Sequence, residues 1–272
     1  MRIVCDLRHT EDHTMKVLHY GAGVDSTAIL IGMCQRCEDV DVIIFADTGG
    51  EHPETYAYLD TMDEWLEAHM YPVITRVRRV GEDGTHGMKS KATHTGPGYQ
   101  TLEGNCLQNH TLPSLAYGRS SCSAKFKVDP QTKWIRSQWP AAHIDHIIGF
   151  DCTEERRTFK FDKFNTDTDQ HHFPLIEWGW DRERCEAEIA AAGLPVPMKS
   201  SCWFCPAMKK HEVKALATNH PDLFQRGLHI EDVAMSGRHH KGKDGSTKGL
   251  GRSWNWRSWA EAEGLVSIEA AS

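Results

Sequence analysis

Two apolar runs, each followed by a loop of small residues and then by a helical pattern, constrain the fold of this chain most. The runs are residues 16–20 and 42–46, and helical spacing follows over residues 25–36 and 53–69. The run 42–46 is apolar throughout, which is typical of a strand covered on both faces of a sheet. This alternation predicts strand-to-helix units around a parallel sheet.

The rest of the chain divides into a continuation of this pattern and a different C-terminal part. Residues 80–121 are rich in Gly, Thr, His and Ser and predict a mobile active-site loop or lid. We expect an α/β fold, a parallel sheet with helices on both faces, over residues 1–199, and a small helical appendage containing cysteines over residues 200–272. Further strands are predicted at residues 73–77 and 146–150, and further helices at residues 123–138, 181–192, 202–217 and 221–235.

Composition narrows the class of protein. The 272 residues carry a formal net charge of -7, which argues against an extended surface for nucleic acid. The apolar runs are far shorter than the roughly 20 residues that span a bilayer, and charges interrupt the N-terminal segment too early for a signal peptide. Nine cysteines at irregular spacing fit a reducing cytoplasm better than a disulfide framework. We therefore expect a cytoplasmic protein, with no membrane partner, that keeps some thiols for metal or sulfur chemistry.

The loop after the first apolar run has the character of an anion site. Small residues there precede a helix, whose unpaired N–H groups and dipole favour a phosphate. Such a turn can also be a tight turn without a ligand. The loop that follows the next strand would face it, because the carboxyl ends of neighbouring parallel strands form a ligand crevice. The predicted binding residues are Gly21, Ala22, Gly23, Val24, Asp25 and Ser26 in the first loop and Phe45, Asp47, Thr48 and Gly49 in the second.

Both loops resemble motifs of one superfamily. Residues 21–26 resemble the SGGxDS loop of the PP-loop, or adenine nucleotide alpha-hydrolase, superfamily, with Gly21 and Ala22 departing from its first Ser and Gly. Residues 45–55 resemble the DTGxxxPET motif of its 3'-phosphoadenosine 5'-phosphosulfate (PAPS) reductase family. The resemblance implies that ATP or PAPS binds with its phosphates at residues 23–26 and that Asp47 faces magnesium or the nucleotide. It also implies that Arg156 and Arg157 hold phosphate or sulfate, and the residue types agree, because guanidinium groups suit such oxyanions.

Cys202 and Cys205 form a CxxC pair, which places two sulfurs on one metal or cluster. A redox pair and a structural zinc with His211 as a ligand are the alternatives. Reductases of the resembled family carry an iron-sulfur cluster on a tandem cysteine pair and a later CxxC, and Cys122 stands at the tandem position here. The resemblance therefore implies a 4Fe-4S cluster on three thiolates with one iron open or bound by Cys106, an arrangement similar to that of iron-sulfur tRNA thiolases.

Three functions remain from the sequence. The leading one is ATP-dependent adenylation with release of pyrophosphate, in which Asp25, Asp47, Arg156 and Arg157 act on the nucleotide and a sulfur donor or reductant feeds the cluster. The second is a PAPS or adenosine phosphosulfate reductase, although no cysteine follows Cys205 to serve as its nucleophile. The third is a non-catalytic nucleotide or redox sensor. Basic residues around Trp254 and Trp256 fit either a nucleic-acid acceptor surface or a packed terminus.

Overall fold

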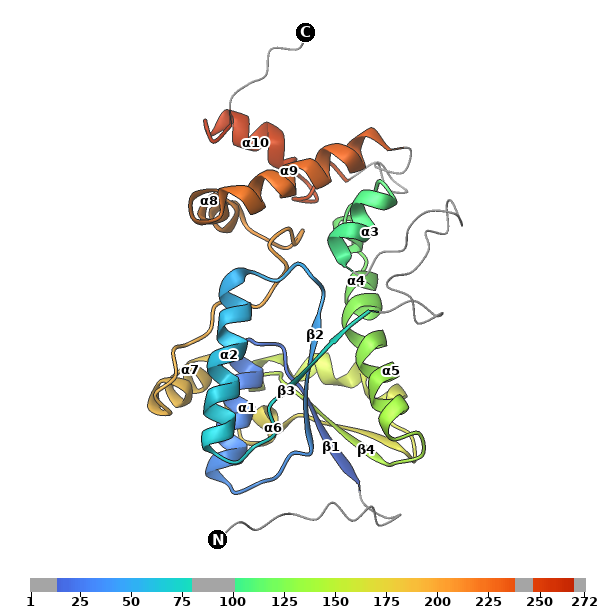
Figure 1. Cartoon of the computed structure of the whole chain (residues 1–272), viewed down its shortest axis with the longest axis vertical. Helices are drawn as coiled ribbons and strands as arrows, with labels where there is room; N and C mark the ends of the chain where they lie inside the picture. The colour runs from blue at the N-terminus through green and yellow to red at the C-terminus, as the bar shows by residue number, and fades with distance from the viewer. Residues whose placement is uncertain (1–13, 80–100, 238–246, 267–272) are drawn as a thin grey trace. The chain divides into compact units, whose positions relative to one another are not determined.

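A parallel sheet of five strands organises the fold in the computed structural model, which describes residues 14–79, 101–237 and 247–266 (Figure 1). The strand order is β3-β2-β1-β4-β5, and the pairings of β1 with β2, β1 with β4 and β4 with β5 are parallel. The predicted α/β class is confirmed. The strands are β1 Met15–His19, β2 Val42–Asp47, β3 Ile74–Arg78, β4 Ile144–Ile148 and β5 Asp169–His172.

Helices flank this sheet on both sides, with α1 and α2 on one side and α5 on the other (Figure 1). Helix α1 is Val24–Gln35, α2 is Pro53–Ala68 and α5 is Asp129–Gln138. Two short helical turns, α4 Ser121–Ser123 and η2 Ala124–Val128, run directly into α5, so the helix predicted at residues 123–138 is confirmed. Helix α6 is Pro174–Glu177 and α7 is Arg182–Ala191.

Strand predictions were wrong at two places. The fourth strand begins and ends two residues earlier than predicted, at Ile144–Ile148. The prediction omitted β5 altogether, because its residues Asp-Gln-His-His are polar and carry no apolar alternation. The stretch between β4 and β5 contains two short 3-10 segments, η3 Cys152–Lys160 and η4 Asp162–Phe164.

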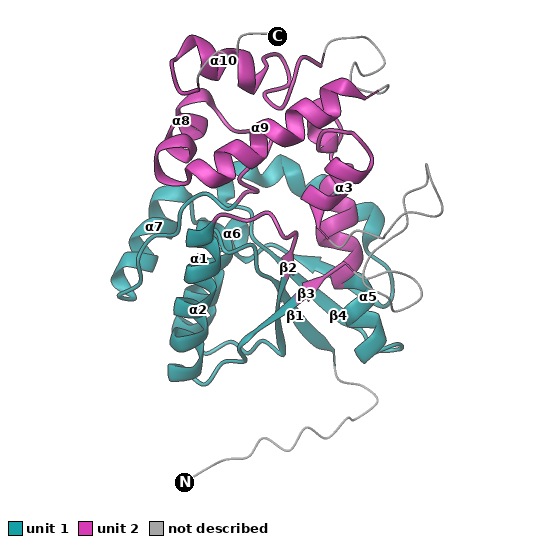
Figure 2. Ribbon diagram, turned by 45° about the horizontal axis from the view of Figure 1, so that its top comes forward, with its two compact units in different colours: residues 1–45, 53–76, 132–200 teal, residues 46–52, 77–131, 201–272 magenta. Residues whose placement is uncertain are grey.

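The chain divides into two compact units (Figure 2). Unit 1 comprises Met1–Phe45, Pro53–Arg76 and Thr132–Ser200, and unit 2 comprises Ala46–His52, Val77–Gln131 and Ser201–Ser272. The predicted domain boundary between residues 199 and 200 stays a prediction. Unit 2 contains α3 Leu102–Gln108, η1 Ser114–Tyr117, α8 Lys210–Asn219, α9 Pro221–Ser236 and α10 Trp256–Ala262.

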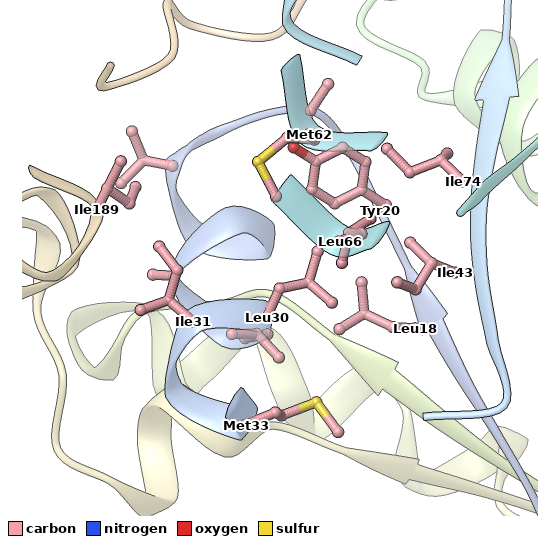
Figure 3. Close-up of a cluster of buried hydrophobic side chains, with 14 of the residues drawn as sticks. Leu18, Tyr20, Leu30, Ile31, Met33, Ile43, Met62, Leu66, Ile74 and Ile189 are labelled. Carbon is pink, nitrogen blue, oxygen red and sulfur yellow. The ribbon is translucent and has the colours of Figure 1, made fainter. Parts of the chain in front are cut away.

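Each unit has its own apolar core. In unit 1, side chains from α1, α2 and α7 pack with those of the strands, as Figure 3 shows around Tyr20, Leu30 and Ile189. Helix α1 is buried along most of its length, which explains its nearly continuous apolar sequence. In unit 2, Trp203, Phe204 and their neighbours form the second core. None of the described helices combines the length and apolar character that crossing a membrane requires.

Three predictions for the second half of the chain need correction or fall outside the described residues. The helix predicted at residues 202–217 begins later, because α8 begins at Lys210 after a run of turns. Trp256 is fully buried and stacks against Phe224, so it cannot stack on a nucleic-acid base and belongs to a packed terminus. The predicted lid at residues 80–121 falls partly on residues 80–100, which lie outside the described residues, and its remainder contains α3 and η1.

Candidate functional site

The loop between β1 and α1 is braced by its own hydrogen bonds. The hydroxyl of Ser26 accepts from the N–H of Gly21 at 3.1 Å and donates to the carbonyl of Gly23 at 3.3 Å. Ser200 adds a bond from its hydroxyl to the Gly21 carbonyl. Gly23 has extended backbone and precedes the first turn of α1, where no side chain caps the helix. The N–H groups of that turn therefore remain suited to an anion, as the sequence predicts.

Ala22 departs from the resembled motif at a position that needs unusual backbone. Its φ is 54°, in the left-handed region that glycine adopts at little cost. An alanine there is strained by roughly 1–2 kcal/mol. The loop keeps its shape because the Ala22 side chain is 1% exposed and packs in the core of unit 1.

Gly149 allows the end of β4 to approach this loop. A Cβ at Gly149 would lie 3.0 Å from the backbone nitrogen of Ser26 and 3.2 Å from the Cβ of Asp25. A larger residue would push the strand end and the loop apart. Two residues later the chain reaches Asp151, so the close approach of Gly149 carries this carboxyl group to the loop.

Three carboxylates meet at the start of α1. Ligand oxygens of Asp25, Asp151 and Glu154 lie within 4.8 Å of one another, the one such group of acidic, His or Cys ligands among the described residues. Arg182 on α7 donates to Asp25 at 3.3 Å. Burial raises the pKa of Asp25, and Asp151 and Glu154 raise it further against the opposing charge of Arg182. Oxygen ligands at this spacing suit Mg²⁺. The sequence predicted Asp25 as a nucleotide-binding and catalytic residue, with Asp47 as the residue that faces magnesium or the nucleotide, and it predicted no site role for Asp151 or Glu154.

The two predicted arginines and Asp47 have different surroundings. Arg156 is exposed, and Arg157 pairs with Glu154 while its guanidinium lies 4.3 Å from the centre of the Phe150 ring. Asp47, in unit 2, pairs with Arg78 and accepts from the N–H of Gly49. The roles assigned to these residues remain predictions.

A line of hydrogen bonds crosses the sheet below the loop, and no pattern in the sequence indicates it. His19 at the end of β1 bonds to Nδ1 of His146 at 2.9 Å, and Nε2 of His146 bonds to Asp169 at 3.0 Å. His171 stacks on His146, and burial, followed by the charge of His146, lowers the pKa of His171 to about 4. These imidazoles lie on neighbouring strands, which only the strand order brings together.

The second predicted loop, residues 47–52, packs against the CxxC segment inside unit 2. A Cβ at Gly50 would lie 2.6 Å from Cε1 of Phe204, and the Gly50 carbonyl accepts from the N–H of Trp203 at 2.8 Å. Gly49 has a φ of 71°. Glu51 then opposes Cys202 in an antiparallel bridge. Position 49 therefore favours glycine because of its positive φ, and position 50 requires glycine because Phe204 lies so close.

Four of the predicted ligands gather in the core of unit 2. Cys106 and Cys202 are buried, and Cys122 and Cys205 pack against the same cluster of apolar residues. Burial raises the pKa of Cys106, and the neighbouring Cys202 and Cys122 raise it further. The four thiols are nevertheless spaced more widely than the carboxylate group. His211, the alternative ligand, lies exposed in the first turn of α8.

A buried polar group adjoins Cys202. Its thiol lies 3.3 Å from the hydroxyl of Thr48 and 3.9 Å from Oε1 of Glu51, which also pairs with Lys127 at 3.3 Å. Burial acts to lower the pKa of Lys127, but the charges of Glu51 and Cys202 outweigh it and raise the pKa. Sequence reasoning missed Glu51 and Lys127. The sequence signal that could have indicated Glu51 is its position between two glycines and a predicted helix.

Comparisons with known proteins find likenesses among solved structures. No protein-family model and no curated protein matches the chain. Among solved structures, the fold is similar to that of the U34-tRNA thiolase NcsA from Methanococcus maripaludis with its [4Fe-4S] cluster. The TM-score is 0.44 and the identity 10%, with 84% of this chain and 74% of that chain covered. A likeness at this level carries no inference about activity.

Proposed function

We propose that this chain is an adenine-nucleotide-dependent enzyme of sulfur chemistry, a PP-loop protein that cleaves ATP to AMP and pyrophosphate and transfers sulfur to an activated acceptor. The observation that carries the proposal is the braced loop at the start of α1 together with the carboxylates of Asp25, Asp151 and Glu154. N–H groups suit the phosphates, and the carboxylates suit the Mg²⁺ that accompanies ATP.

The first step joins an oxygen of the acceptor to the α-phosphorus of ATP. The bond between that phosphorus and the oxygen bridging to the β-phosphorus breaks, and pyrophosphate leaves with the electron pair. Residues 23–26 would hold the departing pyrophosphate through backbone N–H groups, which stabilise charge that develops during the step. Arg156 and Arg157 would bind the same phosphates from the segment after β4. Sulfur then replaces the activated oxygen, and AMP leaves.

The thiol set in unit 2 supports the sulfur chemistry. Soft thiolates select iron-sulfur clusters or zinc, so Cys122, Cys202 and Cys205 fit three irons of a 4Fe-4S cluster and would leave the fourth iron open. When bound, such a cluster would supply a site for the sulfur that is transferred. The chain's own contribution is to pack these thiols against apolar side chains, with Cys106 and Cys202 buried and Cys122 and Cys205 partly buried.

The same cysteines weigh against a PAPS reductase. A reductase needs an accessible thiolate that attacks the sulfonate sulfur. Cys106, a thiol of this set, is 1% exposed, and burial raises its pKa. A buried thiol with a raised pKa is a poor nucleophile at neutral pH.

Calorimetry tests the nucleotide site. Anaerobically prepared protein should bind ATP with Mg²⁺, and Asp25→Asn should weaken that binding by at least tenfold. Asp39→Asn is the matched control, because Asp39 is an exposed residue of the same unit, with 90% of its side chain accessible. Equal ATP affinity in wild type and Asp25→Asn would remove the site assignment.

Product analysis tests the reaction. With ATP and Mg²⁺, pyrophosphate release should depend on the acceptor. The experiment compares a reaction that contains bulk RNA with a reaction that contains no acceptor. With PAPS, mass spectrometry should find no sulfonated cysteine, and thioredoxin should release no sulfite. Thioredoxin-dependent sulfite formation would instead establish the reductase, and ATP binding with no turnover for any acceptor would favour the sensor.

A further inference from the structure

The carboxyl group of Glu51 lies beside a predicted metal ligand for a reason of backbone geometry. Glu51 and Cys202 oppose each other in an antiparallel bridge, although they stand 151 positions apart in the chain. Opposed residues of such a bridge project their side chains to the same side, with Cβ atoms about 4.5–5.5 Å apart. Oε1 of Glu51 accordingly lies 3.9 Å from the sulfur of Cys202.

The second oxygen of this carboxyl group is buried and unsatisfied. The Glu51 side chain is 0% exposed, and Oε1 takes the contacts with Thr48 and Lys127 at 3.1 Å and 3.3 Å. Oε2 is buried and has no hydrogen-bond partner within the part of the chain that the structure describes. Buried oxygens of this kind are uncommon, cost about 1–3 kcal/mol, and call for an explanation such as a bound ion.

We propose that Glu51 is an oxygen ligand of the metal centre held by Cys202 and Cys205, an inference that rests on the proposed sulfur function. Carboxylate oxygen and thiolate sulfur are both ligands of zinc and iron. A metal bound at Oε2 satisfies the buried oxygen that the protein leaves open. Glu51, buried at the thiols, takes the place that the zinc alternative gives to His211, which lies exposed on α8.

Lys127 gives the arrangement its charge balance and its orientation. A metal centre bound to several thiolates and a carboxylate would leave a net negative site, which a neighbouring cation stabilises. The Lys127 ammonium group is 3.3 Å from Oε1, so it holds the carboxylate by one oxygen and leaves the other for the metal. Partners that orient a ligand in this way are common around protein metal sites.

Cobalt binding to the metal-free, full-length chain under anaerobic conditions tests the assignment. Glu51→Gln should weaken Co²⁺ affinity by about 10-fold or more and shift the ligand-field bands. Glu51→Cys should retain tight binding and gain the charge-transfer absorbance of one further thiolate. Glu263→Gln is the matched control, since Glu263 is an exposed acid of the same unit with a 3.7 Å contact to Lys214. Circular dichroism of the metal-free variants checks that each is folded.

The possible outcomes separate this inference from the proposed function. Wild-type affinity and spectrum in Glu51→Gln overturn Glu51 as a ligand, while loss of binding in Cys202→Ser would still support the thiol site. If Glu51→Gln does not fold, the spectrum of Glu51→Cys decides, and unchanged charge-transfer absorbance overturns the assignment. A wild-type chain that binds neither Co²⁺, Zn²⁺ nor an iron-sulfur cluster overturns both proposals.

Discussion

Gly50→Ala tests how tightly the second loop is seated on the CxxC segment. The added methyl group would lie 2.6 Å from Cε1 and 3.2 Å from Cζ of Phe204, whose side chain is fully buried. Real Cβ atoms do not approach this closely, so either the ring or the loop must move. The loop is also bonded to Trp203, and the bridge of Glu51 with Cys202 follows directly.

Two effects of opposite sign set the magnitude. Overpacking a core costs about 1–3 kcal/mol. Alanine at a φ it can adopt gains about 0.4–1 kcal/mol by restricting the unfolded chain, and Gly50 lies outside the left-handed region. Because the midpoint of the overpacking cost exceeds the midpoint of this gain, we expect the free energy of unfolding to fall by about 1.3 kcal/mol, the difference between the two midpoints.

Urea unfolding followed by tryptophan fluorescence measures this change. In a Phe204→Leu background the steric conflict is relieved, so Gly50→Ala should cost much less there than in the wild type. The displaced loop should also weaken Co²⁺ binding at the thiol site. A free energy of unfolding within about 0.3 kcal/mol of wild type, or an equal cost in both backgrounds, would refute the close packing on which the reasoning rests.

Four further variants have distinct expected outcomes. Burial raises the pKa of Asp25 above its ordinary 3.8, so ionisation of this carboxyl group lowers the free energy of unfolding as pH rises through the raised pKa. Asp25→Asn should therefore be more stable than the wild type at pH 7 but not below pH 3.8. Urea unfolding at both pH values measures this difference. Gly149→Ala should weaken ATP binding in calorimetry through its 3.0 Å approach to Ser26, and normal affinity would contradict it. The pKa of His171, lowered to about 4, predicts stability that is complete above pH 6.5 and lost as pH falls toward 4, and His171→Asn should flatten that dependence. Glu231→Gln should cost about 1–3 kcal/mol in urea unfolding, because its buried carboxylate accepts three backbone N–H groups, and a neutral result would exclude that role.

Local patterns in the sequence were sufficient for the fold class and for the two loops. The apolar run at residues 42–46 is strand β2 within one residue, and the small residues before Val24 lead into α1 as predicted. Hydrophobic patterns predict these elements well because a strand buried on both faces and a helix buried along most of its length contain long runs of apolar residues. Strand β5 has no such pattern, because its residues are polar. It forms a strand because its backbone pairs with the edge of β4, and that pairing depends on the tertiary structure.

The grouping of the functional side chains was decided by tertiary structure alone. Asp25 lies in a recognisable motif, whereas Asp151 and Glu154 look in the sequence like part of a charged run. The structure groups them with Asp25 because Gly149 allows their segment to approach the loop. Glu51 meets Cys202 across 151 positions through a single backbone bridge. The sequence encodes local conformation through residue spacing and propensity, and this is why the two loops could be predicted. Contacts between distant residues depend on how whole elements pack, so the sequence alone does not show which acid lies beside which thiol.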